Sequence, residues 1–404
     1  MSGDTITIGD FASFNLAIIV YFLGIHLNRT IPVLNRYNIP EPVSGGMLVA
    51  SAVLVAHLSG LGEITFSLAA RDFLLLYFFT SIGLNARLGD LVKGGLPLVI
   101  LLGLTIGYMV LQNIVAVTAA AAFGQPIASG LIGGTVSLIG GHGTAIAWGP
   151  TLTDGYGVTG AIELGAATAT LGLITASLLG GPIASYLIDR KGAVPGDEVH
   201  QVPTIGLERD EQSYAAVTHT GLMGTILVLN LAIALGAVLQ EALAAAGLDL
   251  PLFVVCLFSG ILLSNTVPEI FPTLSWPARS RSLAVVSDLA LGIFLSMSLM
   301  SLQLWTIAGL AGPMLVTLAA QVAIAALFIL FVVFPLMGRD YEAAVLSAGY
   351  AGFALGATPT AIANMTAVTK HFGAAPRAFL ILPLVAAFFT DLANAIILRL
   401  FLTL

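Results

Sequence analysis

Charge is the scarcest feature of this sequence. Only 9% of its 404 residues are Asp, Glu, Lys or Arg, whereas a soluble globular domain has about 25%. So few charges cannot cover a water-facing surface, which excludes an ordinary soluble domain. The net charge of −7 owes much to a single hydrophilic segment around residues 194–214 and indicates no particular partner; we expect no nucleic acid among the partners.

Cysteine and basic N-terminal residues are scarce as well. The only cysteine, Cys256, excludes an intramolecular disulfide, and its position in an apolar run favours a role in packing. The first ten residues, MSGDTITIGD, contain no Lys or Arg before the first apolar run. A cleavable signal peptide needs a basic segment there, so we expect none.

Hydrophobic residues make up 58% of the chain, and the mean hydropathy is +1.01. Long continuous apolar runs predict an all-α polytopic membrane protein, because a β-barrel would alternate apolar and polar residues. We expect ten spans, at about 11–28, 42–60, 72–90, 96–123, 161–188, 215–240, 250–267, 284–306, 309–337 and 377–402. Two further stretches, 126–150 and 342–370, are too polar and too rich in glycine to be plain spans.

The chain resembles itself at an offset of 216 residues. The letters TAIA occur at 144–147 and at 360–363. The same offset pairs Asp72 with Asp288, Phe78 with Phe294, Pro97 with Pro313, Gly133 with Gly349, Gly140 with Gly356 and Gly157 with Gly373. We therefore predict two repeats, 1–190 and 215–404, joined by a cytoplasmic linker at 191–214.

Five spans per repeat predict that the second repeat enters the membrane from the opposite side, if each broken stretch is a re-entrant hairpin. Basic residues test this prediction, because they favour the cytoplasmic side. With the N-terminus outside, only Arg71 and Arg399 fall outside. The basic residues inside are Arg29, Arg36, Arg87, Lys93, Arg190, Lys191, Arg209, Arg279, Arg281, Arg339, Lys370 and Arg377. We predict an inverted-topology repeat with both termini outside.

The two broken stretches are candidate binding elements. Irregular backbone survives within the membrane only when it is buried in protein or lines a cavity, and a glycine-rich break exposes N–H and C=O groups to a ligand. Hydroxyl and amide oxygens nearby suit an alkali cation. These groups belong to Thr135, Ser137 and Thr144 in the first stretch, and to Thr358, Thr360 and Asn364 in the second. The alternative is that the small residues only allow close helix packing.

Three further polar groups lie within the apolar sequence. Asp391 and Asn394 share one helix face in the last span. Placing a carboxylate at the centre of a membrane span costs about 2.5–3.5 kcal/mol, so Asp391 is a functional candidate. The alternative is that it is a structural partner of other groups in the bundle. We expect His142, in GGHG, either to hydrogen-bond the backbone or to lie near the substrate. A metal site is disfavoured, because no second His, Cys or carboxylate has the sequence spacing to His142 that metal ligands show. Gln112 and Asn113 are expected to make interhelical hydrogen bonds.

Five segments in this order resemble the sodium/glutamate symporter family over essentially the whole chain: IPEPVSGG (39–46), FFTSIGLNA (78–86), SLIGGHGTAIAW (137–148), GFALGATPTAIANM (352–365) and FFTDLANA (388–395). That family is grouped with sodium-coupled 2-hydroxycarboxylate carriers. The resemblance implies a homodimeric carrier of the bacterial inner membrane that moves L-glutamate inward with sodium as the coupling ion and no cofactor. Ala354 stands where the family usually has glycine, in GFGLG.

The resemblance and the broken stretches together give the predicted site. The predicted substrate-binding residues are Ser137, Gly141, His142, Gly143, Thr144, Thr358, Thr360, Asn364, Asp391 and Asn394. The predicted sodium-binding residues are Thr135, Gly140, Gly356, Ala357, Thr358 and Asn364.

Alternatives remain open for the substrate and the mechanism. No Arg or Lys lies in mid-span to bind a carboxylate, so backbone N–H donors would have to do more of this. The sequence does not separate glutamate from aspartate or another dicarboxylate. Asp391 could bind either the substrate ammonium group or sodium, and proton coupling is an alternative to sodium coupling.

An intramembrane enzyme is disfavoured because HExxH, GxGD and GxSG patterns are missing, and a channel with re-entrant loops is a second alternative. An elevator mechanism is expected, although the sequence does not identify the moving spans or those that form the dimer.

Overall fold

The computed structural model describes residues 5–36, 39–60, 62–86, 89–191, 217–245 and 250–403. Helices dominate these residues, and eight of the described helices are long and apolar enough to cross a membrane. They are Asp10–Thr30 (α1), Glu41–Leu58 (α3), Gly95–Ala122 of α5, Ala161–Asp189 of α8, His219–Ala245 (α9), Leu252–Ile270 (α10), Arg281–Met300 (α11) and Ala311–Leu336, which begins with α12. The chain is a multi-pass membrane protein.

The other two predicted spans correspond to helices that are short or interrupted. The span predicted at 72–90 is α4, Ala69–Asn85, which has 17 residues and ends earlier than predicted. The span predicted at 377–402 is α16, Pro376–Leu384, followed by a π-helical turn, Val385–Phe389, and by α17, Thr390–Leu402. Pro383 removes an N–H donor from the helical ladder just before the π-helical turn, which accounts for the interruption.

Some boundaries and elements differ from the prediction. The span predicted at 284–306 is too long, because α11 ends at Met300 and a 3₁₀ helix, Leu304–Leu310, follows it. Two short strands, Thr5–Ile8 (β1) and Glu63–Phe66 (β2), pair in parallel, and neither was predicted. A short helix, Pro32–Arg36 (α2), was not predicted either. The predicted linker at 191–214 lies outside the described residues except for Lys191, where α8 ends.

The chain forms two compact units, and both halves of the sequence contribute to each. Unit 1 contains the described residues within 1–87, 146–153 and 210–309, and unit 2 those within 88–145, 154–209 and 310–404. This grouping by contact is a different division from the predicted division into repeats.

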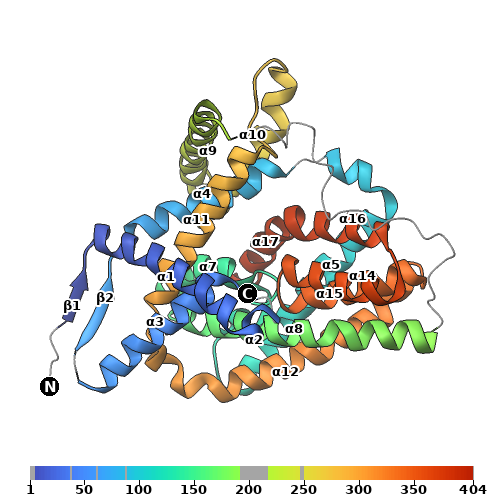
Figure 1. Ribbon diagram of the computed structural model, residues 1–404, viewed down its shortest axis with the longest axis horizontal. Coiled ribbons are helices and arrows are strands. Elements are labelled where there is room, and N and C mark those ends of the chain that lie inside the picture. Colours follow the sequence, from blue (N-terminus) through green and yellow to red (C-terminus); the bar gives the residue numbers. More distant parts are fainter. Residues whose placement is uncertain are drawn as a thin grey trace. The chain divides into compact units, whose positions relative to one another are not determined.

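Unit 1 is built mainly from α1, α3 and α4 of the first half and α9, α10 and α11 of the second (Figure 1). Small residues allow its helices to approach closely: a methyl group added to Gly260 in α10 would lie 2.7 Å from the carbonyl oxygen of Thr80 in α4. The hydroxyls of Ser81 in α4 and Ser287 in α11 are hydrogen-bonded at 2.7 Å. Packing through small side chains and hydroxyls is typical of helices in membranes.

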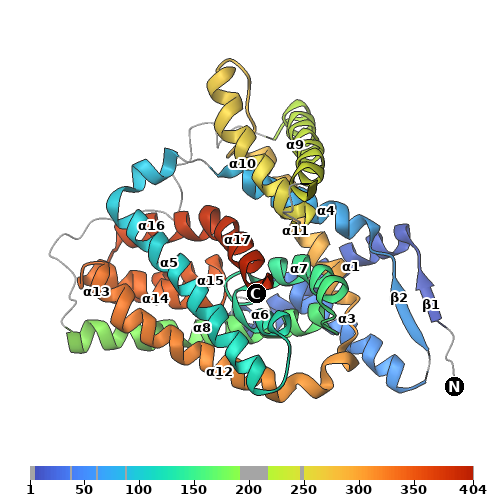
Figure 2. The same cartoon turned by 180° about the vertical axis from the view of Figure 1, so that it is seen from behind.

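Unit 2 holds the second broken stretch and residues 126–145 of the first (Figure 2). Its elements are α5 (Gly89–Ala122), α6 (Ile127–Leu131), the ends of α7 (Gly141–Tyr156), α8 (Ala161–Lys191), α12 (Ala311–Phe328), α13 (Phe334–Leu336), α14 (Tyr341–Leu355), α15 (Thr358–Phe372), α16 and α17. Within it α8 packs against α14 and α15, and α5 packs against α6 and α12. The long helices α5, α8 and α12 therefore support the broken segments.

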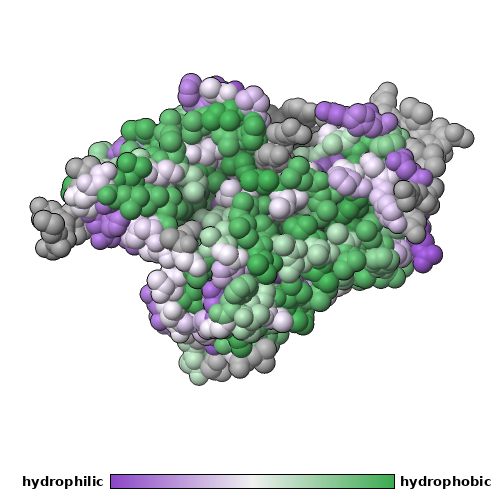
Figure 3. Space-filling model, turned by 90° about the horizontal axis from the view of Figure 1, so that it is seen from below, coloured by the Kyte–Doolittle hydropathy of each residue, from purple (hydrophilic) through white to green (hydrophobic). Residues whose placement is uncertain are grey.

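The exposed surface is strongly apolar, as a membrane-spanning chain requires. Figure 3 shows a face that is covered widely by hydrophobic residues, with hydrophilic residues mostly towards its edges. Large apolar side chains with more than half of their surface exposed occur on several helices, among them Phe22 in α1, Leu231 in α9 and Phe331 after α12. In water such exposure would be unfavourable, whereas lipid tails solvate these side chains.

Candidate functional site

The first broken stretch is a helix that loses its regular hydrogen bonding over a few residues. Helix α6 continues into a π-helical turn, Ile132–Val136, in which Gly134 leaves the helical region with φ −108° and ψ −135°. Helical structure resumes at Gly141, whose φ of +66° is a left-handed conformation that glycine adopts without steric cost. The predicted break at 126–150 is therefore confirmed as an interruption, centred on residues 134–141.

The second broken stretch is shorter. Helix α14 ends at Leu355, and Gly356 turns the chain with φ −141° and ψ −101°. Helix α15 then starts at Thr358, with Pro359 in its first turn, where a missing N–H costs nothing. The N–H of Ala357 donates to the carbonyl of Gly352 at 3.1 Å, and α14 and α15 pack against each other.

The two breaks lie next to each other inside unit 2. A methyl group added to Gly141 would lie 3.8 Å from the carbonyl oxygen of Gly356. The backbones of the two chain segments are therefore only about one methyl group apart. Both breaks also contact α8: a methyl group added to Gly172 would clash with the carbonyl oxygen of Leu355 and lie 2.8 Å from the side chain of Leu138. Gly141 and Gly356, which are 215 positions apart in the sequence, thus meet in one place.

Thr135 is the centre of a hydrogen-bond network at the first break. Its backbone N–H and its hydroxyl donate to Oδ1 of Asn113 in α5, at 2.9 and 3.0 Å. Its carbonyl accepts from the N–H of Gly140 at 2.9 Å and from Nδ2 of Asn394 in α17 at 3.2 Å. The structure therefore brings two of the predicted residues, Thr135 and Asn394, into direct contact.

Several fully buried polar atoms around the breaks have no hydrogen-bond partner within the described chain. The predicted residues in this group contribute Ser137 Oγ, Thr360 Oγ1 and Asn394 Oδ1. Each of these side chains is at most 1% exposed. Buried polar atoms are nearly always hydrogen-bonded in folded proteins, and an unpartnered one costs about 1–3 kcal/mol. Unpartnered atoms of this kind can be satisfied by a bound ligand.

His142 and Asn364 use their polar atoms within the protein. His142 Nε2 is hydrogen-bonded to Oγ1 of Thr170 in α8 at 2.9 Å; since that hydroxyl donates to the carbonyl of Ala166, Nε2 carries the hydrogen. Of the two roles expected for His142, the described chain shows a bond to a side chain in place of one to the backbone, and a role near the substrate stays a prediction. Asn364 Nδ2 donates to the carbonyls of Ala176 and Ala348, at 3.1 and 3.2 Å, which fixes α15 against α8 and α14.

Asp391 lies in the first turn of α17 and is half-buried. In the part of the chain that the structure describes, neither an ion pair nor a hydrogen bond involves its carboxylate. It shares a helix with Asn394, one turn further on. Among the described residues no group of three or more His, Cys, Asp or Glu could hold a metal ion. The oxygen atoms available to a cation are thus hydroxyls, amides, backbone carbonyls and this carboxylate.

The remaining predicted residues line the breaks themselves. Thr144 and Gly143 lie in the first turn of α7, where Thr144 is buried, and Gly140 directly precedes Gly141, at which α7 begins. Thr358 and Ala357 are partly exposed at the start of α15. All predicted site residues therefore lie in unit 2, within or beside the two breaks or on α17.

Three amide side chains support the breaks, and only part of this was predicted. The expected interhelical bonds of Gln112 and Asn113 are confirmed: Gln112 Nε2 donates to the carbonyl of Ala354 at 2.9 Å. Gln321 in α12 was not predicted; its Nε2 donates to the carbonyls of Gln112 and Gly133, at 2.8 and 3.2 Å. The only sign of this role in the sequence is a single Gln within the apolar run LAAQVA.

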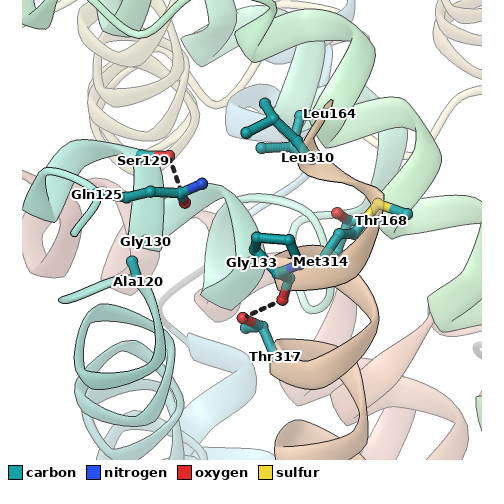
Figure 4. Close-up of a pocket in the computed structure, with 11 residues that line it drawn as sticks. Ala120, Gln125, Ser129, Gly130, Gly133, Leu164, Thr168, Leu310, Met314 and Thr317 are labelled. Carbon is teal, nitrogen blue, oxygen red and sulfur yellow. Dashed lines mark hydrogen bonds between the residues drawn. The ribbon is translucent and has the colours of Figure 1, made fainter. Parts of the chain in front are cut away.

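A small cavity lies beside the first arm of the first broken segment (Figure 4). Its lining comes from α5, the segment 125–133, α8 and α12, and consists of Ala120, Gln125, Ser129, Gly130, Gly133, Leu164, Thr168, Leu310, Pro313, Met314 and Thr317. The cavity contains side chains of mixed polarity and none of the predicted site residues. It therefore lies apart from the point where the two breaks meet.

Comparisons with known proteins find relatives over nearly the whole chain. The family model described as sodium/glutamate symporter matches residues 6–374. The chain is 41% identical to a sodium/glutamate symporter of Haemophilus influenzae over 394 residues, which is 97% of each chain. It is 40% identical to the sodium/glutamate symporter of Escherichia coli K12 over 396 residues, again 97% of each chain.

Proposed function

Because this chain belongs to the sodium/glutamate symporter family, we propose that it is a secondary active transporter that carries L-glutamate into the cell together with sodium ions. The observation that carries this proposal is the meeting of two broken helices in unit 2, with buried, unpartnered polar atoms around them. Transport needs no set of catalytic residues such as an enzyme has, and the relatives are transporters rather than enzymes.

The chemistry at the breaks suits both a cation and an anion. Freed carbonyls and hydroxyls at Thr135, Gly356 and Thr358 are hard oxygen ligands for sodium, while the N-terminal ends of α7 and α15 offer backbone N–H donors to a carboxylate. Asp391, in the first turn of α17, is the acidic group available to the substrate ammonium or to sodium. Sodium acts as the coupling ion, and no cofactor is required.

An inverted repeat is supported by the bounds of the elements. Adding 216 to α1, α4 and α7 gives 226–246, 285–301 and 357–372, close to α9 (219–245), α11 (281–300) and α15 (358–372). Contacts recur in the same way with the halves exchanged: α3 packs against α11, and α10 packs against α4. The rings of Phe78 and Phe294, which the offset pairs, lie 6.5 Å apart, as expected near a twofold axis.

We further propose re-entrant hairpins, both termini outside, a homodimer and a bacterial inner-membrane location. We infer an elevator mechanism in which unit 2, with the binding site, moves relative to a unit 1 scaffold. The two units are each internally compact, which is what a rigid-body motion requires. A cysteine crosslink between the units that left transport intact would contradict this mechanism.

The function is tested with purified protein in liposomes. An inward sodium gradient should drive accumulation of labelled L-glutamate, and replacing sodium by choline should abolish it. Uptake that persists in choline but disappears with a protonophore would instead support proton coupling. Competition by aspartate and other dicarboxylates would define the substrate class.

A counterflow assay separates a carrier from the channel alternative. Liposomes preloaded with unlabelled glutamate should transiently accumulate labelled glutamate above its outside concentration, because a carrier exchanges one substrate for another. A channel equilibrates label without accumulation, so a curve that rises only to equilibrium would overturn the carrier proposal.

A further inference from the structure

Asn113, in the middle of α5, has a buried donor group that the protein leaves unused. Its side chain is 0% exposed, and Nδ2 has no hydrogen-bond partner in the described chain. Its orientation is unambiguous, because Oδ1 accepts from the backbone N–H of Thr135 at 2.9 Å and only the oxygen of an amide can accept that bond. The free atom is therefore the NH₂ group.

The other unpartnered amide atoms near the breaks have the opposite chemistry. Gln112 and Gln321 donate through Nε2 to backbone carbonyls, and Asn394 donates through Nδ2 to the carbonyl of Thr135, so each is left with a free oxygen. An amide oxygen can only accept, whereas an amide NH₂ can only donate. Among these four amides, Asn113 is the one whose NH₂ group makes no hydrogen bond at all within the described chain.

Asn113 lies against the first break. A methyl group added to Gly134 would collide with Oδ1 of Asn113 and lie 3.4 Å from its Cα, so the irregular backbone of the break rests directly on this residue. Thr135 connects Asn113 to Asn394 through one residue, and the unpartnered hydroxyl of Ser137 follows two positions later. The NH₂ group of Asn113, the free Oδ1 of Asn394 and the hydroxyl of Ser137 thus belong to the surroundings of the same turn of chain.

We propose that the Asn113 side-chain NH₂ donates a hydrogen bond to a carboxylate of the transported substrate and thereby determines specificity for an anionic ligand. This inference rests on the proposed glutamate transport. Within the described residues of unit 2, no Lys or Arg is among the buried side chains, so a carboxylate entering the site must be held by neutral donors. A buried amide NH₂ supplies two hydrogens for this purpose.

The decisive variant is Asn113→Asp. It keeps the size of the side chain and the oxygen that accepts from Thr135, but it replaces the donor by an acceptor. The expected result is an increase in the half-saturating glutamate concentration on the order of 10- to 100-fold at saturating sodium, because a hydrogen bond to a charged group is lost and two carboxylates face each other. The half-saturating sodium concentration, measured at saturating glutamate, should change less than the value for glutamate.

Asn230→Asp, at an exposed position in another span, is the control for the added charge. Asn230, in α9 of unit 1, also accepts a hydrogen bond through Oδ1, from the Tyr77 hydroxyl at 2.7 Å, and its variant keeps that bond. This control introduces the same carboxylate into a span that contributes none of the predicted site residues, and it should leave glutamate affinity unchanged. If both variants lose affinity equally, the loss at Asn113 is a general effect of the new charge and the proposal is overturned.

Two further measurements keep the proposal falsifiable. If Asn113→Asp is not recovered as folded protein, Asn113→Ala is tested; it removes the donor without adding charge and should also weaken glutamate binding more than sodium binding. Unchanged glutamate affinity in the folded variants, or a loss confined to sodium dependence, would overturn the inference. Wild-type protein that fails to transport glutamate with sodium would instead refute the proposed function itself.

Discussion

Gly352 is a position where one added methyl group should disturb the proposed binding site. It lies in α14, four residues before the second break, and faces the first turn of α15. A methyl group added there would lie 2.7 Å from both the backbone N and the Cα of Ala361, and 2.8 Å from the carbonyl carbon of Thr360. These are backbone atoms, which cannot rotate away as the end of a side chain can.

The size of the effect follows from these distances. Ordinary contacts of a methyl group begin near 3.4 Å, so Gly352→Ala requires α15 to move by about 0.7 Å (3.4 minus 2.7). That movement would displace Thr358 and Thr360 and stretch the bond from the Ala357 N–H to the Gly352 carbonyl. A misplacement of 1 Å in a binding site can cost about 100-fold, so we expect glutamate affinity to fall on the order of 10-fold. Overpacking should lower the free energy of unfolding by about 1–3 kcal/mol.

The measurement is the glutamate dependence of sodium-driven uptake in liposomes, together with the thermal stability of the purified protein. Gly181→Ala is the control: Gly181 lies in α8 of the same unit, and an added methyl group there would contact nothing within 4 Å. It should leave uptake unchanged and slightly stabilise the helix. Ala361→Gly should not rescue Gly352→Ala, because the clash involves the backbone of Ala361. Wild-type glutamate affinity in Gly352→Ala would refute the reasoning.

Two further predictions concern charge and topology. Asp391→Asn removes a carboxylate for which the described chain provides no cation. If Asp391 binds the substrate ammonium group, the variant should weaken glutamate binding on the order of 2–5 kcal/mol; if it binds sodium, the sodium dependence should shift. Transport with unchanged dependence on both glutamate and sodium would remove Asp391 from the site. In a Cys256→Ala background, Lys191→Cys should react with an impermeant maleimide only after the membrane is permeabilised, because the proposed inverted topology places residue 191 inside. Reaction in intact cells would contradict that topology.

The sequence alone determined the class of the protein and the position of its helices. Continuous apolar runs and 9% charge are incompatible with a water-facing surface, so they predict membrane spans whatever the tertiary structure is. Helices are present at all ten predicted spans, and the two glycine-rich stretches are interrupted helices at 134–141 and 356–357. These features are local: hydropathy, glycine and proline act within a few residues of the chain.

Only the tertiary structure decided which polar groups meet and which remain free. Gln321 and Asn364 are each single amides in an otherwise small or apolar neighbourhood of sequence, yet Gln321 holds the first break and Asn364 bonds α8 and α14. The strands β1 and β2 pair across 58 residues, a contact that four-residue segments do not specify. A side chain's hydrogen-bonding capacity can be read from its chemistry, but its partner depends on which distant helix packs against it. The adjacency of Gly141 and Gly356 is therefore a property of the fold, because close packing of helices far apart in sequence is what brings the two breaks together.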